Sequence, residues 1–210
     1  MISSFSILLV GFLLGMRHAT DADHVVAVTT IVSDQPSLLR ASAIGALWGI
    51  GHTITIFLVG GAIVAFHLVI PPRLGLGMEF VVALMLIVLG ALNLSGRTLP
   101  ASSAARPVVV GLVHGLAGSA FIALLVVAAV PGVWLGLFYL ALFGVGTIAG
   151  MALITLAIAL PSAITARQFG AMQRYLRLAS GVASVAFGLL LVQHGINDGL
   201  FAAAPRWTPR

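Results

Sequence analysis

The chain has 210 residues, of which 60% are hydrophobic and only 7% are charged, and its mean hydropathy of +1.18 lies far above that of a soluble domain. The sequence therefore predicts an integral membrane protein. Its ten basic residues are all arginines, against five acidic residues, and no two of them are adjacent, which favours loop anchoring at a membrane and argues against nucleic acid as a partner. Cysteine is absent, which excludes disulfides and thiolate metal ligands.

Six apolar segments are long enough to cross the hydrocarbon core of a bilayer, which takes roughly 20 helical residues. No alternating strand pattern is present, so every segment is predicted to be a helix. No basic residue precedes the first apolar run, which is therefore interpreted as a span and not as a cleaved signal. The spans predicted within one transmembrane domain, 1–210, are residues 3–32, 41–66, 77–95, 107–130, 133–160 and 177–201.

The arginines of the connecting segments predict an orientation. Cytoplasmic loops carry an excess of arginine, and six arginines lie in loops on one side of the predicted spans against three on the other side. This asymmetry predicts a multi-pass protein of the cell (inner) membrane with both termini outside. The cytoplasmic set is Arg40, Arg97, Arg106, Arg167, Arg174 and Arg177, and the outer set is Arg73, Arg206 and Arg210.

The two halves of the sequence resemble each other. The segment "ALWGIGHTIT" returns as "ALFGVGTIAG" 95 residues later, and "GMRHA" aligns with "GLVHG" at an offset of 96, which places His18 over His114. A repeated unit with three spans must enter the membrane in opposite directions, so the sequence predicts a 3+3 inverted repeat, about 1–96 and 107–201. That architecture is typical of transporters.

Glycine pairs with a spacing of four residues occur in several of the predicted spans. This spacing permits the backbones of neighbouring helices to approach closely. We therefore expect tight helix packing at Gly11 and Gly15, Gly45 and Gly49, Gly111 and Gly115, and Gly146 and Gly150.

The first predicted span contains a polar segment, "RHATDADH", between two apolar runs. The flanking residues 5–16 and 25–32 are each too short to cross a bilayer alone, so the polar segment is expected near mid-membrane. An ionised group there costs at least ~2.5 kcal/mol unless it is paired, faces a cavity or binds a ligand. On one unbroken helix His18 and His24 are separated by roughly 9 Å along the axis, which hinders binding of a common ion. We therefore predict local unwinding within residues 17–24.

Two interpretations of this polar segment compete. In the first, its histidines and aspartates bind a divalent metal, and imidazole with carboxylate but no thiolate favours Ni²⁺, Co²⁺ or Zn²⁺ over Cu(I). In the second, Arg17 pairs with Asp21 or Asp23 and merely anchors neighbouring helices. A structural ion pair does not require two histidines, so the first interpretation is preferred, with Arg17 balancing charge through Asp21.

The segment "RHATDADHV" resembles the His-x4-Asp-His signature of the nickel/cobalt transporter family, typically R-H-A-x-D-A-D-H-I, with Val25 in the last position. The segment "WGIGHTITIF" is similar to a second family motif, Gly-His-(Ser/Thr), and implies that His52 is a metal-pathway residue. The family's third signature, L-G-F-D-T-A-T-E, is missing, and the corresponding helix, "GLVHGLAGSAFIALL", has His114 as its only ionisable group. Together with six predicted spans in place of eight, this departure favours the six-helix, urease-accessory-type permeases of the family.

The resemblance implies a membrane permease for divalent transition metals, with uptake of Ni²⁺ and/or Co²⁺ into the cytoplasm, and not an enzyme. An exporter that uses the same site in the other direction is an alternative. A third hypothesis, an intramembrane metallohydrolase, is weakened because His-Glu-x-x-His is absent and Glu79 is the only glutamate. There is no lysine and no Gly-x4-Gly-Lys motif, so a gradient, the membrane potential or a separate subunit must drive transport.

The expected ligand is the transported Ni²⁺ or Co²⁺, and no prosthetic group is predicted. The expected partners are this ion and the lipid bilayer, and a homo-oligomer is left open. The candidate metal-site residues are His18, Asp21, Asp23, His24, His52 and His114. His67, at the end of a predicted span, is expected to be an interfacial residue without a metal role.

Overall fold

The computed structural model describes residues 4–32, 35, 37–68, 70–97, 104–115, 132–165 and 170–206. Within these ranges all of the regular secondary structure is helical. The helices are α1 (Ser4–His18), α2 (Ala22–Val32), α3 (Leu38–Phe66), α4 (Pro72–Leu94), α5 (Ala105–His114), α7 (Val133–Thr165) and α8 (Gly170–Asn197).

Four of these helices are long and apolar enough to cross a membrane, namely α3, α4, α7 and the part of α8 from Arg174 to Asn197. Their outer surfaces carry large apolar side chains that are more than half exposed. Such a surface is unfavourable in water and suits contact with lipid tails. The chain is therefore a multi-pass membrane protein, with exposed apolar residues that include Leu58, Val88, Phe138 and Leu189.

The ends of the helices differ from the predicted ends of the spans for local reasons. Helix α3 begins at Leu38 and not at residue 41, because the Ser37 side chain accepts a hydrogen bond from the Arg40 backbone N–H and caps the helix. Helix α4 begins at Pro72 and not at residue 77, because the fixed φ and missing N–H of proline suit the first helical turn. The predicted spans 133–160 and 177–201 correspond to α7 and α8, and of the predicted span 107–130 only residues 107–115 are described.

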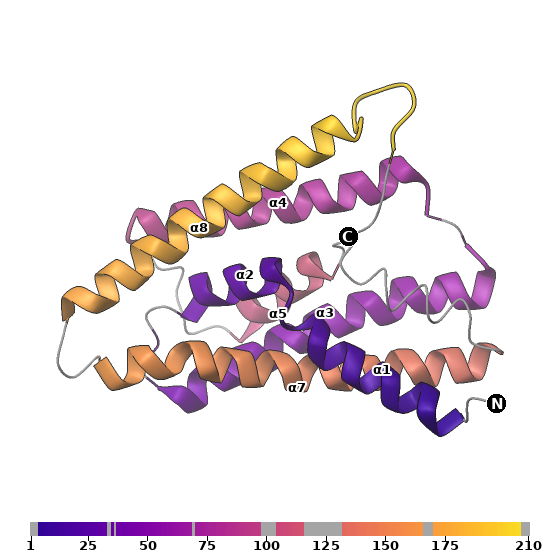
Figure 1. Cartoon of the computed structure of the whole chain (residues 1–210), viewed down its shortest axis with the longest axis horizontal. Coiled ribbons are helices and arrows are strands. Elements are labelled where there is room, and N and C mark those ends of the chain that lie inside the picture. Colours follow the sequence, from indigo (N-terminus) through magenta and orange to yellow (C-terminus); the bar gives the residue numbers. More distant parts are fainter. Residues whose placement is uncertain are drawn as a thin grey trace.

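Figure 1 shows α4 and α8 side by side on one side of the molecule, and α1, α3 and α7 on the other side. The short helices α2 and α5 lie between them: α2 contacts α4, α7 and α8, and α5 contacts α3 and α4. The main hydrophobic core lies in this central region, with buried side chains that include Val28, Trp48, Leu86 and Met151. The fold therefore brings the ends of two short helices into the interior of the bundle.

Helix α1 packs on α7 with almost no space between the two backbones. A Cβ atom on Gly15 would overlap the carbonyl oxygen of Phe143, and a Cβ atom on Gly146 would overlap the carbonyl oxygen of Phe12. Only glycine allows this approach, because any side chain would push the helices apart. The C-terminal end of α1, which carries His18, is thereby held against α7.

Helix α5 packs on α3 in the same manner. A Cβ atom on Gly111 would overlap the carbonyl oxygen of Trp48, and a Cβ atom on Gly51 would overlap that of Val108. The end of α5, which carries His114, is thereby held against the middle of α3. The predicted role of the glycine pairs is confirmed, because all eight contact another helix: Gly11, Gly15, Gly45, Gly49, Gly111, Gly115, Gly146 and Gly150.

Candidate metal site

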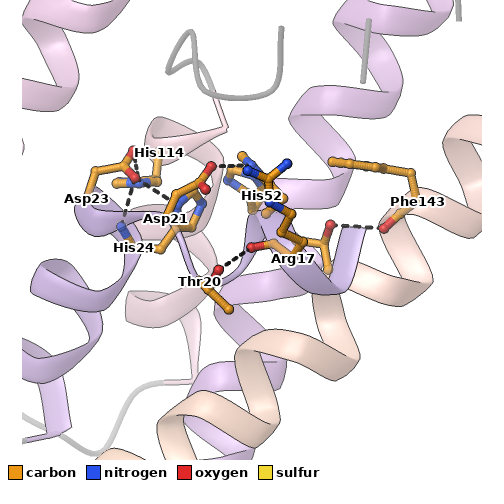
Figure 2. Close-up of polar contacts among 10 residues, drawn as sticks. Arg17, Thr20, Asp21, Asp23, His24, His52, His114 and Phe143 are labelled. Atoms are coloured by element: carbon orange, nitrogen blue, oxygen red, sulfur yellow. Dashed lines mark hydrogen bonds and ion pairs between the residues drawn. The ribbon is translucent and has the colours of Figure 1, made fainter. Parts of the chain in front are cut away.

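Six side chains of the sequence-predicted site lie where α1, α2, α3 and α5 meet (Figure 2). They come from the last turn of α1, the turn that follows it, the first turn of α2, the middle of α3 and the last residue of α5. The structure thus brings together residues that are up to 96 positions apart in the sequence. In chain order they are His18, Asp21, Asp23, His24, His52 and His114.

The chain leaves the helical path after α1 and resumes it in α2. The Thr20 backbone N–H bonds to the carbonyl oxygen of Arg17, three residues earlier, in place of the four-residue spacing of an α-helix. The Thr20 hydroxyl donates to the same oxygen at 2.6 Å and helps to end α1. The predicted unwinding within residues 17–24 is confirmed. It brings the ring centroids of His18 and His24 to 4.5 Å from each other, which an unbroken helix could not do.

The His18 ring is held at both of its nitrogen atoms. Its Nδ1 lies 2.9 Å from Oδ2 of Asp21, and because an ionised carboxylate only accepts, Nδ1 carries the proton and donates it. Its Nε2 therefore presents a lone pair, and this atom lies 2.9 Å from Nε2 of His52. A carboxylate on the outer nitrogen of a histidine is the usual way in which proteins orient an imidazole toward a metal.

Asp23 joins the helix break to the second half of the chain. It lies in the first turn of α2, where the helix N-terminus favours negative charge. Its Oδ1 accepts hydrogen bonds from the backbone N–H and from Nδ1 of His24, both at 3.0 Å, and its Oδ2 lies 3.1 Å from Nε2 of His114. Figure 2 shows Asp23 between these two histidines. With the proton on Nδ1, the free lone pair of His24 is on Nε2.

The side chains that could bind a metal form two overlapping groups of three. Within each group, one ligand atom per residue lies within 4.8 Å of the other two. The four histidines are almost completely buried, with exposed fractions of 5% or less. Asp21 belongs to neither group, and its side chain bonds to Nδ1 of His18. The first group is His18, His24 and His52, and the second is Asp23, His24 and His114.

Three buried ring nitrogens of the cluster have no hydrogen-bond partner in the part of the chain that the structure describes: His24 Nε2, His52 Nδ1 and His114 Nδ1. Each such atom costs roughly 1–3 kcal/mol when it is buried unpaired. Three of them at one place are unfavourable for a purely structural cluster. Neutral imidazoles with a carboxylate are, however, suitable ligands for Ni²⁺, Co²⁺ and Zn²⁺.

The prediction that Arg17 forms an ion pair with Asp21 is wrong. Among the ion pairs of the described residues Asp21 pairs with His18, and none joins it to Arg17, whose side chain is exposed. The physical reason is the end of α1 at His18: the i,i+4 spacing places two residues on one face only while the helix continues. Asp21 thus orients a histidine and does not neutralise the arginine.

The two remaining histidines of the chain lie outside the cluster. His67 is the C-cap residue of α3, with an exposed side chain and a φ of 52°. His194, near the end of α8, has its Nε2 at 3.0 Å from Oδ2 of Asp198. The cluster therefore collects four of the six histidines in the sequence.

Two aromatic side chains that sequence reasoning did not assign to the site cover the cluster. The Trp48 ring centroid lies 5.6 Å from that of His24 and 5.3 Å from that of His114, and the Phe143 ring lies 5.4 Å from that of His18. Both rings are buried. The sequence contained a signal for these two residues, because Trp48 and Phe143 occupy equivalent positions in the two halves of the sequence repeat. The two rings place apolar surface against three of the four histidines.

The fold and the cluster define the class of the protein: an all-helical, multi-pass membrane protein with a buried site of histidine and aspartate side chains. No family model and no solved structure matches the chain. The chain is 35% identical to the urease accessory protein UreH of Bacillus sp. (strain TB-90), over 217 residues that include 93% of this chain and 95% of the relative. The chain belongs to the family of this urease accessory protein.

This relationship supports the resemblance to urease-accessory-type proteins that the motifs of the first 66 residues indicate. It extends over nearly all of both chains and so includes the second half, where the third family signature is missing. The name of the relative describes an accessory protein and not an enzyme, which confirms the prediction that the chain is not an enzyme.

Proposed function

We propose that the chain is a permease that moves Ni²⁺ and/or Co²⁺ across the cell membrane into the cytoplasm. The observation that carries this proposal is a buried cluster of four imidazoles and a carboxylate at a helix break inside an apolar helical bundle. Transporters commonly use such discontinuous helices to present ligands to an ion at mid-membrane. The metal is the substrate of the protein, and the cluster is its binding site on the way across.

The donor atoms support the choice of ion. The Nε2 atoms of His18 and His52 are 2.9 Å apart, the length of a hydrogen bond, so one of them carries a proton that a bound ion would displace. Imidazole and carboxylate ligands without a thiolate suit Ni²⁺, Co²⁺ and Zn²⁺ and do not suit Cu(I). The relative is named for urease, a nickel-dependent enzyme, which further supports Ni²⁺.

The proposed ligands are the five side chains of the two groups, and Asp21 is proposed to orient one of them. The carboxylate of Asp21 holds the proton on Nδ1 of His18, so that Nε2 remains available to the ion. Asp23 has two roles, because one oxygen orients His24 and the other faces His114. The proposed ligands are His18, Asp23, His24, His52 and His114.

We further propose that the two halves of the chain form a 3+3 inverted repeat. Gly15 meets Phe143 where α1 packs on α7, and Gly111 meets Trp48 where α5 packs on α3. The two glycines are 96 positions apart and the two aromatic residues are 95 apart, the same offsets as in the sequence repeat. Reciprocal contacts of this kind are expected when two similar units are related by a pseudo-twofold axis. They support a transporter with its site at the interface of the halves.

The transport proposal is tested by reconstitution of the purified protein into liposomes that contain a metal-sensitive dye. Ni²⁺, Co²⁺, Zn²⁺ and Mn²⁺ are offered outside in turn. We expect Ni²⁺ or Co²⁺ to enter, and Mn²⁺ to be excluded because it prefers oxygen ligands. Liposomes without protein are the control, and loading the ions inside instead of outside measures export. If none of the four ions crosses the membrane in either direction, the proposal is wrong.

The proposed orientation has a separate test. We expect both termini outside and the segment between Arg97 and Arg106 in the cytoplasm, because of the six-to-three distribution of loop arginines. The chain has no cysteine, so the single variants Ser102→Cys and Thr208→Cys can be labelled with a membrane-impermeant reagent in intact cells. Both positions lie outside the described residues. We expect labelling at 208 and none at 102; the reverse pattern contradicts the orientation.

A further inference from the structure

We propose that the cluster offers a metal ion two adjacent positions that share His24, and that the ion passes from one to the other during transport. This inference rests on the proposed function, because it divides the path of the same ion into two steps. The first position has ligands only from α1, α2 and α3, whereas the second includes a ligand from α5, in the other half of the chain. The first position is formed by His18, His24 and His52, and the second by Asp23, His24 and His114.

The geometry places His24 between the two groups. Its ring centroid lies 4.5 Å from that of His18 and 4.9 Å from that of His52, and 4.4 Å from that of His114. The rings of His52 and His114, which belong to different groups, are farther apart, at 5.9 Å. The described residues form no larger group whose ligand atoms all lie within 4.8 Å of one another. The five ligands are therefore arranged for two neighbouring positions and not for one common centre.

Each group contains two side chains that are joined by a hydrogen bond, which a bound ion would replace. In the first, Nε2 of His18 and Nε2 of His52 are 2.9 Å apart. In the second, Nε2 of His114 donates to Oδ2 of Asp23 at 3.1 Å, so the lone pair of His114 is on Nδ1, which is buried and has no partner among the described residues. His24 Nε2 is buried and has no partner among the described residues, so it is free to complete either set. One ring nitrogen thus serves both positions.

The two positions differ in chemistry. The first has three imidazole nitrogens, which favour the later divalent metals of the first transition row. The second replaces one nitrogen by the Asp23 carboxylate, whose negative charge offsets part of the charge of the ion. An ion that moves from the first position to the second therefore exchanges His18 and His52 for a carboxylate and His114. The first position selects the ion, and the second holds it at the interface between the halves.

A shared ligand gives the ion a low-energy route. Three protein ligands leave coordination positions open on an ion that prefers four to six, so ligands of the second group can bind before all those of the first have left. His24 remains bound throughout. The ion is never released bare into the apolar interior, where an unpaired charge is most costly. Since both positions need His24, the cluster holds one ion at a time.

The inference predicts that binding and transport respond differently to the same substitutions. The variants are His52→Gln, which damages the first position, His114→Gln, which damages the second, the double variant, and His24→Gln, which damages both. Ni²⁺ binding to the full-length protein is measured by calorimetry, and Ni²⁺ uptake is measured in liposomes. The matched control is His67→Asn, because His67 is exposed at the end of α3 and asparagine tolerates its positive φ.

We expect each single variant, His52→Gln and His114→Gln, to bind one Ni²⁺ with an affinity lowered by no more than about tenfold, because the other position remains. Both should lose uptake, because the ion needs both positions to cross. The double variant and His24→Gln should bind more than about a hundredfold more weakly, since no intact position is left. The His67→Asn protein should behave like the wild type in both assays.

Two results would overturn the inference. If either single variant binds Ni²⁺ as weakly as His24→Gln, all ligands hold one ion at a single centre. If the His114→Gln protein takes up Ni²⁺ at the wild-type rate, the second position is not on the path. A wild-type protein that neither binds nor transports Ni²⁺ instead contradicts the proposed function itself. Melting temperature and gel filtration show which variants fold, and asparagine at the same positions provides a second set of variants.

Discussion

The His24→Ala variant is expected to lose metal uptake almost completely while the protein remains folded in the membrane. His24 is the one imidazole that belongs to both groups of candidate ligands, so its loss leaves neither group complete. Loss of a mere hydrogen-bond partner of a metal ligand already costs 10–100-fold, so we expect uptake to fall by about a hundredfold or more. Uptake of Ni²⁺ by liposomes, at equal amounts of reconstituted protein, measures the effect.

The same assay extends to His18→Ala, Asp23→Ala and His52→Ala, for which we also expect loss of uptake. His67→Asn is the control, and we expect it to transport at the wild-type rate because its side chain lies outside the cluster. Wild-type uptake by both the His18→Ala and the His24→Ala proteins, with unchanged Ni²⁺ binding in calorimetry, would show that the cluster is structural. The permease proposal would then lose its main support.

The second large effect is expected from Gly15→Val, which should prevent stable folding. The new Cβ atom would overlap the carbonyl oxygen of Phe143, which is backbone and cannot rotate away. Overpacking of a core typically costs 1–3 kcal/mol, and we expect at least about this much where a helix must move as a whole. The end of α1 carries His18, so a shift of α1 also displaces one of the candidate ligands. Gel filtration of heated, detergent-solubilised samples gives the apparent melting temperature.

Gly77→Val is the matched control for this experiment. A Cβ atom on Gly77, in α4, meets nothing within 4 Å, so the same substitution adds a side chain without a clash. Gly111→Val is expected to resemble Gly15→Val, because Gly111 meets the Trp48 carbonyl oxygen in the corresponding contact of α5 with α3. Equal melting temperatures for Gly15→Val and Gly77→Val would contradict the close packing of α1 on α7.

The location of the cluster explains how the chain tolerates polar groups in an apolar bundle. The carboxylates of Asp21 and Asp23 each bond to a ring nitrogen of a histidine, and Asp23 lies at the N-terminal end of α2, where a negative charge is favoured. These contacts satisfy several polar atoms of the cluster, and three buried ring nitrogens, His24 Nε2, His52 Nδ1 and His114 Nδ1, have no partner among the described residues. The unpartnered nitrogens support the proposal that the cluster binds an ion.

Much of this could be predicted from local sequence. Hydropathy and the absence of alternating strands predicted an all-helical membrane protein, because burial in lipid requires long apolar helices. The polar segment between residues 17 and 24 predicted a break in the first span, since its histidines cannot reach a common ion from one unbroken helix. The helix ends were less predictable, because capping by Ser37 and the Pro72 start depend on individual side chains.

Only the tertiary structure decided how the site is assembled. The partner of Asp21 depends on the residue at which α1 ends, so helical spacing alone predicted Arg17 where the structure has His18. The meeting of His114 with Asp23 depends on the glycine contact of α5 with α3, which joins segments about 60 positions apart. The sequence by itself determined which ligand types are present and where the helix breaks, because both are local properties. The division of the ligands into two groups around His24 depends on interhelical distances, which only the packed bundle determines.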